Sequence, residues 1–345
     1  LVVTPAILNY TASAESTAIY GQFTLYPGGR DSGLSLTAGG RYTWDTKSII
    51  RLQNGAAPLT TPELGNRSFS KFTWNLIARY EFNPDISVYA RAATGYRSGG
   101  FNASDPAAPG TFVIPSFDAE SVTSFELGVK SELFDRHLTL NVAAYRNIYD
   151  DLAVIVPVLT GTGTFQSRIT NAGKVNYTGI EADFNARFNS NFSIDGSVGY
   201  VDVDFVRLMA GQPVNPANPI VNIASVANGG YVAPFTANVG ANVAFPINWG
   251  DAEVRFRVSY THEDGRYSFN NTISSPFNDA LLGDDRDTID AQLVLDRMPF
   301  AGGEARLMVW AKNLTNGHDF ARGIDFGPLG YAGGYYAEPR TFGAT

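Results

Sequence analysis

The three histidines are the residues of this sequence best suited to acid–base chemistry near neutral pH. His137 falls in an expected short turn and His318 in an expected long loop. Neither has a serine or an aspartate at a spacing that suggests a nucleophile and its base. His262 stands beside Glu263 and Asp264 in "THEDGR", at the end of an expected strand. It could join a hydrolase site or contact a ligand, but a solvated histidine at a loop edge is the simpler interpretation. We therefore predict no catalytic residue.

Two other motifs could hold an ion or a phosphate group. In "GDDRDTID" four carboxylates lie between Asp284 and Asp290, and such oxygen ligands suit Ca2+. The motif lacks the spacing of a known calcium loop, so we interpret it as an acidic loop that enters a strand. The glycines of "GYRSGG" do not precede an expected helix, unlike those of a phosphate-binding loop. The sequence therefore predicts no metal site and no cofactor, and the absence of cysteine excludes thiolate ligands.

The remaining chemistry is binding by side chains at points where strands become loops. Loops rich in Asn, Thr, Gly and Tyr above a polar interior suit a sugar-like or chelate-like ligand. A purely structural role at the rim is the alternative for each candidate. Neutral substitutions of the two arginines among them are expected to weaken ligand binding without impairing assembly. The candidate ligand-binding residues are Tyr96, Arg97, Phe101, Tyr149, Asp151, Arg168 and His262.

An alternation of apolar and polar residues predicts the elements that position these side chains. Along "FTWNLIARYEF", Phe72, Trp74 and Leu76 fall on one parity, while Thr73 and Asn75 fall on the other. The pattern resumes after the turn "NPD" and returns in other segments. About 13 strands are predicted in this way, including a very long one with a bulge. The clearest segments are residues 86–97, 120–133, 192–206, 252–262 and 287–297, and the very long strand covers residues 165–188 with its bulge at residues 171–173.

Three features favour a membrane-spanning barrel over a soluble β-sandwich, which could also have one polar face. Short connections such as "NPD" and "FDRH" alternate with long ones, as they do in outer-membrane barrels. Aromatic residues flank the short turns, and several strands exceed the roughly 10 tilted residues that cross a bilayer. The long connections are expected near residues 52–66, 98–119, 208–231, 264–286 and 317–334. The flanking aromatic residues are Phe82, Phe134, Phe188, Phe192, Trp249 and Phe300.

The composition of the 345-residue chain agrees with this fold. Its formal net charge of −8 argues against a nucleic-acid partner, which would need a basic surface. No run of about 18 apolar residues predicts a transmembrane helix, and the first residues do not match the pattern of a signal peptide.

Several stretches, taken together and in order, resemble the C-terminal part of a TonB-dependent outer-membrane receptor and cover most of the chain. They include "STAIYGQFTLYPGG", "ISVYARAATGYRSGGFN", "SFELGVKSELFDRHLTLNVAAYRNIYDDL", "ITNAGKVNYTGIEADF", "VWAKNLTN" and "YYAEPRTFGAT". The resemblance implies a 22-stranded antiparallel transmembrane barrel with a plug domain in its lumen, of which this chain would supply about the last 13 strands. Single-chain bacterial barrels have an even number of strands, so we expect a fragment without the plug. Residues 1–16 would end an extracellular loop, and residues 17–345 would form the incomplete barrel.

The function implied by the resemblance is TonB-dependent active uptake of a scarce, bulky nutrient across the outer membrane of a Gram-negative bacterium. A ferric siderophore is the expected ligand, while vitamin B12, oligosaccharides and other metal chelates remain open. The implied partners are outer-membrane lipid and the TonB–ExbB–ExbD complex, which acts through the plug domain. A passive porin, an outer-membrane enzyme and a soluble β-sandwich or adhesin are the alternatives.

Overall fold

The computed structural model describes residues 7–55, 57–105, 107, 110–159, 165–210, 221–273, 275–327 and 330–345, and these form an almost purely β structure. The strands are β1 (Ile7–Leu25), β2 (Leu34–Gly55), β3 (Pro58–Asn83), β4 (Ile86–Arg97), β5 (Gly100–Phe101), β6 (Ser116–Phe117), β7 (Glu120–Leu133), β8 (Leu138–Leu159), β9 (Phe165–Arg187), β10 (Phe192–Ala210), β11 (Val221–Asn222), β12 (Phe235–Pro246), β13 (Glu253–Glu263), β14 (Arg286–Phe300), β15 (Gly303–Lys312), β16 (Phe320–Phe326), β17 (Tyr331–Tyr336) and β18 (Thr341–Ala344). Short 3-10 turns are η1 (Arg30–Ser32), η2 (Ala224–Val226) and η3 (Asp279–Leu281). Within the described ranges, no helix has the length and apolar character needed to cross a membrane.

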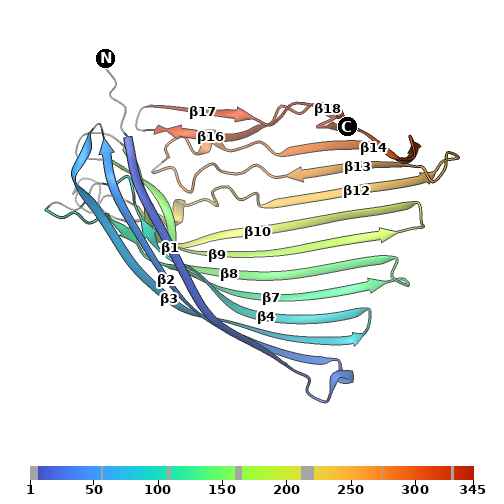
Figure 1. The fold of residues 1–345 in the computed structure, drawn as a ribbon, viewed down its shortest axis with the longest axis horizontal. Coiled ribbons are helices and arrows are strands. Elements are labelled where there is room, and N and C mark those ends of the chain that lie inside the picture. Colours follow the sequence, from blue (N-terminus) through green and yellow to red (C-terminus); the bar gives the residue numbers. More distant parts are fainter. Residues whose placement is uncertain are drawn as a thin grey trace.

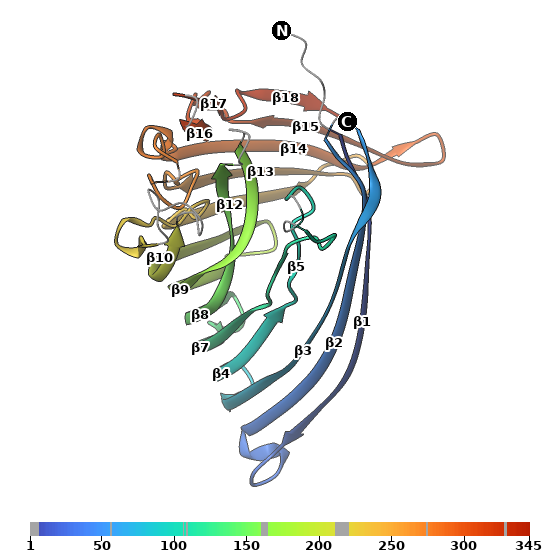
Figure 2. The same ribbon diagram turned by 90° about the vertical axis from the view of Figure 1, so that its left-hand side faces the viewer.

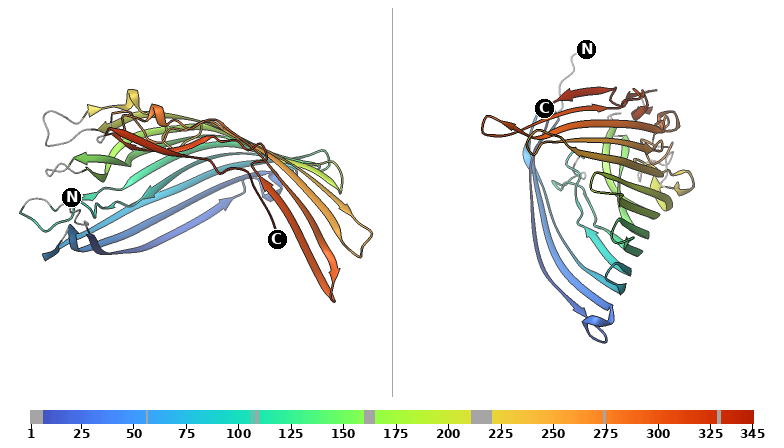
Figure 3. Two further views of the ribbon diagram at one scale, coloured as in Figure 1. Left: turned by 90° about the horizontal axis from the view of Figure 1, so that it is seen from above. Right: turned by 90° about the vertical axis from the view of Figure 1, so that its right-hand side faces the viewer.

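Thirteen of the described strands join side by side into one antiparallel wall (Figure 1). They follow the order of the chain from β1 through β4, β7 to β10 and β12 to β15, and end at β18. The wall is an open, strongly curved sheet with β1 and β18 at its edges (Figure 3). Short turns at one end of the wall alternate with long connections at the other. The predicted all-β, antiparallel architecture is therefore confirmed.

Alternation along the strands gives the wall a polar face and an apolar face. On β13, Arg257 lies opposite Gln292 of β14 on the polar face, and Val258 lies opposite Ala291 on the other. The polar face is concave, because Arg67 on the same face donates a hydrogen bond to the loop that Figure 2 shows in the hollow of the sheet. Most of the predicted turn-flanking aromatic residues are exposed. These are Phe82, Phe134, Phe188, Trp249 and Phe300.

Two expected loops are strand in the structure. β1 begins at Ile7, so residues 7–16 belong to the wall, while residues 1–6 lie outside the described residues. The expected long loop at residues 52–66 is instead the tip of the β2–β3 hairpin, in which Arg51 pairs with Glu63. β4 pairs with β3 only from Asn75 onward, so this tip projects beyond its neighbour. One side of this tip is held by polar contacts, since the buried Arg51 donates to the backbone carbonyls of Ala103 and Asp105. Its sequence therefore lacks the alternation that marks the rest of the strand.

The very long strand and its bulge are present as predicted. Leu152 of β8 pairs with Gly173 of β9 and Ala153 pairs with Asn171, which leaves Ala172 without a partner in the ladder. The side chain of Ala172 joins a buried apolar cluster above the concave face. The cluster comprises Val154, Ala172, Val175, Phe205, Leu208 and Ile223. Its last member, Ile223, comes from the described part of the β10–β12 connection, which here folds inward over the wall.

The β4–β7 connection crosses between two projecting hairpins, and we call its described residues within 98–119 the strap. On one side, the backbone of Leu64 in β3 exchanges two hydrogen bonds of 2.7 and 2.9 Å with the strap. On the other side, the Asn102 side chain makes two hydrogen bonds of 2.8 and 2.9 Å with the backbone of Ile169 in β9. The strap therefore ties the β2–β3 hairpin to the β8–β9 hairpin.

Candidate functional site

A pocket on the concave face is the candidate binding site, and we call it the tyrosine pocket. Its volume is about 560 Å3, which lies within the range of small-molecule sites. Strands β4, β7, β8 and β9 supply its lining of aromatic rings, carboxylates, amides and one guanidinium. The lining residues are Arg91, Ser124, Glu126, Tyr145, Asn147, Tyr149, Leu152, Tyr177 and Glu181.

Strand register brings several of these side chains to one level of the wall. Arg91 of β4 lies opposite Glu126 of β7, and Glu126 lies opposite Tyr145 of β8. Tyr145 in turn lies opposite Gly179 of β9, and its ring covers this glycine, where a Cβ atom would collide with it. The ring therefore lies along the wall, and the pocket stays open above it.

Two further tyrosines form the upper part of the pocket. The rings of Tyr149 and Tyr177 meet edge to face, with centroids 5.6 Å apart and planes at 75°. Both rings, together with Leu152, pack against the buried apolar cluster above them. An edge-to-face pair held in this way offers a preorganised aromatic surface, because little side-chain freedom is lost when a ligand packs on it.

The charged groups of the pocket are linked to one another. Nη1 of Arg91 lies 3.7 Å from Oε2 of Glu126, and Nε of Arg91 donates a 3.0 Å hydrogen bond to Asn75. The hydroxyl of Tyr89 donates a 2.6 Å hydrogen bond to Oε1 of Glu126. The carboxylate of Glu181 is exposed beside Tyr145. This set can bind and orient a ligand through stacking and hydrogen bonds, and it contains no nucleophile paired with a base.

One of the sequence-predicted site residues, Tyr149, lines the pocket. Arg97 lies above it and forms an ion pair with Glu120, with Nε 2.9 Å from Oε1. The hydroxyl of Tyr96 donates a 2.6 Å hydrogen bond to Asp45 of β2. The ring of Phe101 packs over Gly65 of β3. Tyr96, Arg97 and Phe101 thus hold strands and strap together.

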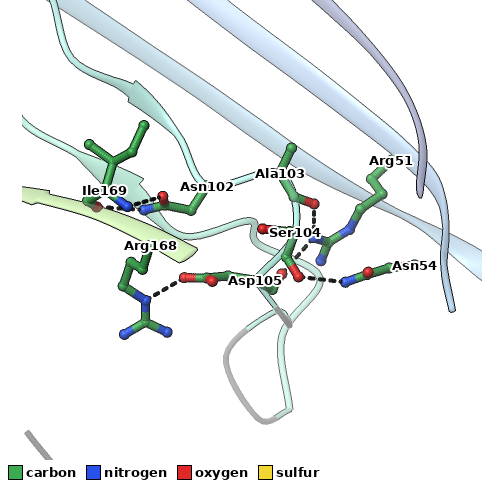
Figure 4. A network of polar contacts seen from close by, with 8 residues as sticks. All are labelled: Arg51, Asn54, Asn102, Ala103, Ser104, Asp105, Arg168 and Ile169. Carbon is green, nitrogen blue, oxygen red and sulfur yellow. Dashed lines mark hydrogen bonds and ion pairs between the residues drawn. The ribbon is translucent and has the colours of Figure 1, made fainter. Parts of the chain in front are cut away.

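Two more predicted residues lie where the long hairpins meet the strap. Asp151 has a φ of 55°, and its carboxylate forms an ion pair with Arg207 of β10, whose Nη2 lies 3.2 Å from Oδ1. Nε of Arg168 donates to Oδ2 of the buried Asp105 in the strap (Figure 4). Neither side chain lines the tyrosine pocket.

His262 lies apart from the other predicted residues. It pairs with Ala237 of β12 and Asp287 of β14, on the parity of the apolar outer face. Its Nδ1 lies 2.8 Å from Oδ1 of Asp287, and its Nε2 lies 3.0 Å from Oδ1 of Asp264. The structure therefore places His262 on the outside of the rim.

The pocket residues Arg91, Tyr145, Tyr177 and Glu181 were not among the sequence-predicted site residues. Each falls on the polar parity of its strand, and that signal was available in the sequence. Only the register between neighbouring strands shows that they meet, and register depends on contacts far apart in the chain. Among the described residues, no group of three or more His, Asp or Glu side chains is arranged to hold a metal ion.

The chain matches the family of TonB dependent receptor-like β-barrel domains over residues 2–341, and it therefore belongs to this family. Its family and its homologues are receptors and transporters, not enzymes. Among curated proteins, it is 28% identical over 201 residues to the pesticin receptor of Yersinia pestis. That stretch is 58% of this chain and 27% of the relative, and the pesticin receptor of Yersinia enterocolitica gives the same values.

Solved structures share the fold. The ferric yersiniabactin uptake receptor FyuA from Yersinia pestis superposes with a TM-score of 0.70 at 20% identity, over 97% of this chain and 45% of that chain. The siderophore receptor PiuA from Acinetobacter baumannii gives a TM-score of 0.67 at 16% identity, over 97% of this chain and 43% of that chain. This chain thus spans less than half the length of these two receptors.

Proposed function

We propose that this protein takes up a scarce, bulky ferric siderophore across the outer membrane of a Gram-negative bacterium, in a process that depends on TonB. Membership of the TonB-dependent receptor family supports the class of transporter. The names of two structural relatives, a ferric yersiniabactin uptake receptor and a siderophore receptor, support a ferric chelate as the ligand. In this proposal the apolar outer face contacts lipid, and the TonB–ExbB–ExbD complex acts through a plug domain in the lumen.

The tyrosine pocket is the observation that carries the choice of ligand. A ferric siderophore combines flat or alkyl surfaces with many oxygen acceptors. The rings of the Tyr149–Tyr177 pair offer a surface for the flat or alkyl parts of the chelate. The tyrosine hydroxyls and the Arg91 guanidinium offer hydrogen-bond donors for its oxygen acceptors. The chain's own residues would bind and orient the chelate without any covalent step.

The test is uptake of radioactive ferric chelates by iron-starved cells that carry the full-length protein and no other chelate receptor. Uptake should require both this protein and TonB. Replacing both Tyr149 and Tyr177 with leucine should lower uptake about tenfold, because each edge-to-face aromatic contact contributes about 0.5–1.5 kcal/mol. Tyr42→Leu, on the exposed outer face, is the matched control and should have no effect.

A passive porin is the alternative that the same experiment can distinguish. Flux through a porin would continue without TonB and without a proton-motive force, and it would rise linearly with the concentration of solute. Uptake of that kind would overturn the proposed function. TonB-dependent uptake that does not respond to the tyrosine substitutions would instead exclude the tyrosine pocket as the ligand contact.

A further inference from the structure

The outer face of the wall carries an apolar groove with a volume of about 740 Å3. Most of its lining residues have the outward parity, and exposed large side chains such as Leu36, Leu76 and Phe125 form its walls. Alanines lie between these walls, where Ala78 of β3 pairs with Ala90 of β4. Alanine leaves the backbone partly uncovered, so residues of the inner parity also line the groove. A groove of this kind can hold a flexible apolar chain.

The groove runs obliquely through the apolar band of the outer face. At one end, Leu25 is the last residue of β1, at the end of the wall that carries the short turns. At the other end, Arg146 of β8 follows the outward apolar residues of its strand, which are Leu138, Leu140, Val142 and Ala144. Short turns of outer-membrane barrels face the periplasm, so Arg146 lies toward the extracellular side. Five strand intervals separate β1 from β8, and at about 4.8 Å each they give the groove a length of about 24 Å.

Arg146 is an unpaired cation at the extracellular end of the groove. Its side chain is exposed, and its neighbours across the ladder are Phe125 of β7 and Thr178 of β9. Within the described residues it has no ion pair and no side-chain hydrogen bond. The outward carboxylate of Asp202 lies beyond Thr178 on β10, about 10 Å away at the usual strand spacing. A guanidinium that faces lipid is costly unless it meets an anionic or polar partner, and a lipid phosphate is such a partner.

Hydroxyl groups stand beside this guanidinium on the outer face. Thr178 is its direct neighbour on β9. Thr123 of β7 pairs with Ile148, the next outward residue of β8 after Arg146. A guanidinium flanked by hydroxyls suits a headgroup that combines phosphate with sugar hydroxyls.

We infer that the groove binds a phosphorylated glycolipid of the outer leaflet, with a phosphate on Arg146 and one acyl chain in the groove. In a Gram-negative outer membrane this chemistry belongs to lipid A. The acyl chain covers Leu76 and Phe125, and the two threonine hydroxyls face the sugar. The inference rests on the proposed function only for the placement of the outer face in lipid, and it assumes nothing about the chelate.

The test titrates the purified full-length protein in detergent with three lipids and measures apparent dissociation constants by native mass spectrometry. The lipids are bisphosphorylated lipid A, the same lipid A with both phosphates removed, and phosphatidylglycerol. The unmodified protein should bind lipid A about tenfold more tightly than the dephosphorylated form, because the latter loses the charge-assisted hydrogen bonds to the guanidinium. Phosphatidylglycerol should bind more weakly than lipid A, because its phosphodiester carries a charge of about −1, whereas a phosphomonoester carries about −1.5 to −2.

Two substitutions separate the phosphate contact from the groove. Arg146→Gln should reduce the preference for lipid A over its dephosphorylated form to about twofold or less. Arg79→Gln, which replaces a half-exposed arginine on the concave face, is the matched control and should keep the preference. Ala90→Leu fills the groove and should weaken binding of both forms about tenfold, which corresponds to roughly two methylene groups withdrawn from it. Ala241→Leu makes the same change on the outer face of β12, away from the groove, and should weaken neither.

Equal binding of the two forms of lipid A to the unmodified protein, or an unchanged preference in Arg146→Gln, would overturn the phosphate contact. Tighter binding of phosphatidylglycerol than of lipid A would reject the glycolipid, and unchanged binding in Ala90→Leu would reject the groove. Each of these results would leave the uptake function intact. Lipid A binding as expected, without uptake of any ferric chelate, would reject the uptake function and keep the lipid site.

Discussion

The guanidinium of Arg257 and the carboxylate of Asp195 form a two-pronged ion pair across the concave face. Nη1 lies 2.6 Å from Oδ1 and Nη2 lies 2.7 Å from Oδ2. Arg257 belongs to β13 and Asp195 to β10, so the pair passes over the intervening strand β12. It can do so because Gly240 of β12 lies beneath the guanidinium and has no side chain.

Gly240→Ala should therefore weaken the wall. A Cβ atom at this position would collide with the guanidinium and push it off Asp195. Both partners are about 30% exposed, so the expected loss is about 1 kcal/mol in the free energy of unfolding. Thermal unfolding of the full-length protein in detergent measures this loss. Gly39→Ala is the control, because its Cβ would meet Gln22 at an ordinary 3.5 Å. Equal stability of the two variants would contradict the role of Gly240.

Arg51 should be the strongest single anchor of the strap. Its side chain is fully buried, forms an ion pair with Glu63 and donates through Nη1 to the backbone carbonyls of Ala103 and Asp105 (Figure 4). Arg51→Met would leave the Glu63 carboxylate nearly buried without its partner, which typically costs about 3–5 kcal/mol.

Hydrogen exchange of the strap amides measures the effect of Arg51→Met. A loss of about 3 kcal/mol in local opening corresponds to exchange that is roughly 100-fold faster. Arg79→Met is the control, because its ion pair with Glu81 is about half exposed and should contribute little. Exchange in the strap that is equally slow in both variants would exclude Arg51 as its anchor.

A comparison of Arg168→Gln with Asp105→Asn should separate a direct role of Arg168 in ligand binding from a structural one. Arg168 pairs with Asp105, which is only 1% exposed. If the pair acts by holding the strap, both substitutions should speed hydrogen exchange in the strap and weaken chelate binding to a similar extent, about tenfold or less. The structure favours this outcome. Weaker binding in Arg168→Gln alone would instead indicate that the guanidinium touches the ligand.

The sequence predicted the strands well because alternation is a local property. Each residue of "AEVRFRVSYTH" shows its face without reference to any other strand, and the bulge near Ala172 was visible in the same way. The projecting tip of β2–β3 resembles a loop in sequence because polar contacts such as those of the buried Arg51, instead of an apolar face, hold it in place. The pairing of Arg51 with the strap and the meeting of Arg91 with Tyr145 depend on register between strands. No local pattern encodes that register, so these sites could not be predicted.

His262→Gln should leave chelate uptake within twofold of the unmodified protein, because His262 lies on the outer face of the rim. Its neighbours there support this position: the hydroxyl of Tyr260, which is 39% exposed, donates to the same Asp287 carboxylate that contacts His262. Arg91→Gln, on the concave face at the tyrosine pocket, is the positive control and should lower uptake about tenfold through the lost donors. Both variants should reach the membrane in normal amounts, which immunoblotting of outer-membrane fractions checks. A tenfold loss of uptake in His262→Gln at normal abundance would show that the ligand path crosses the outer rim, and the pocket would then not be the main contact.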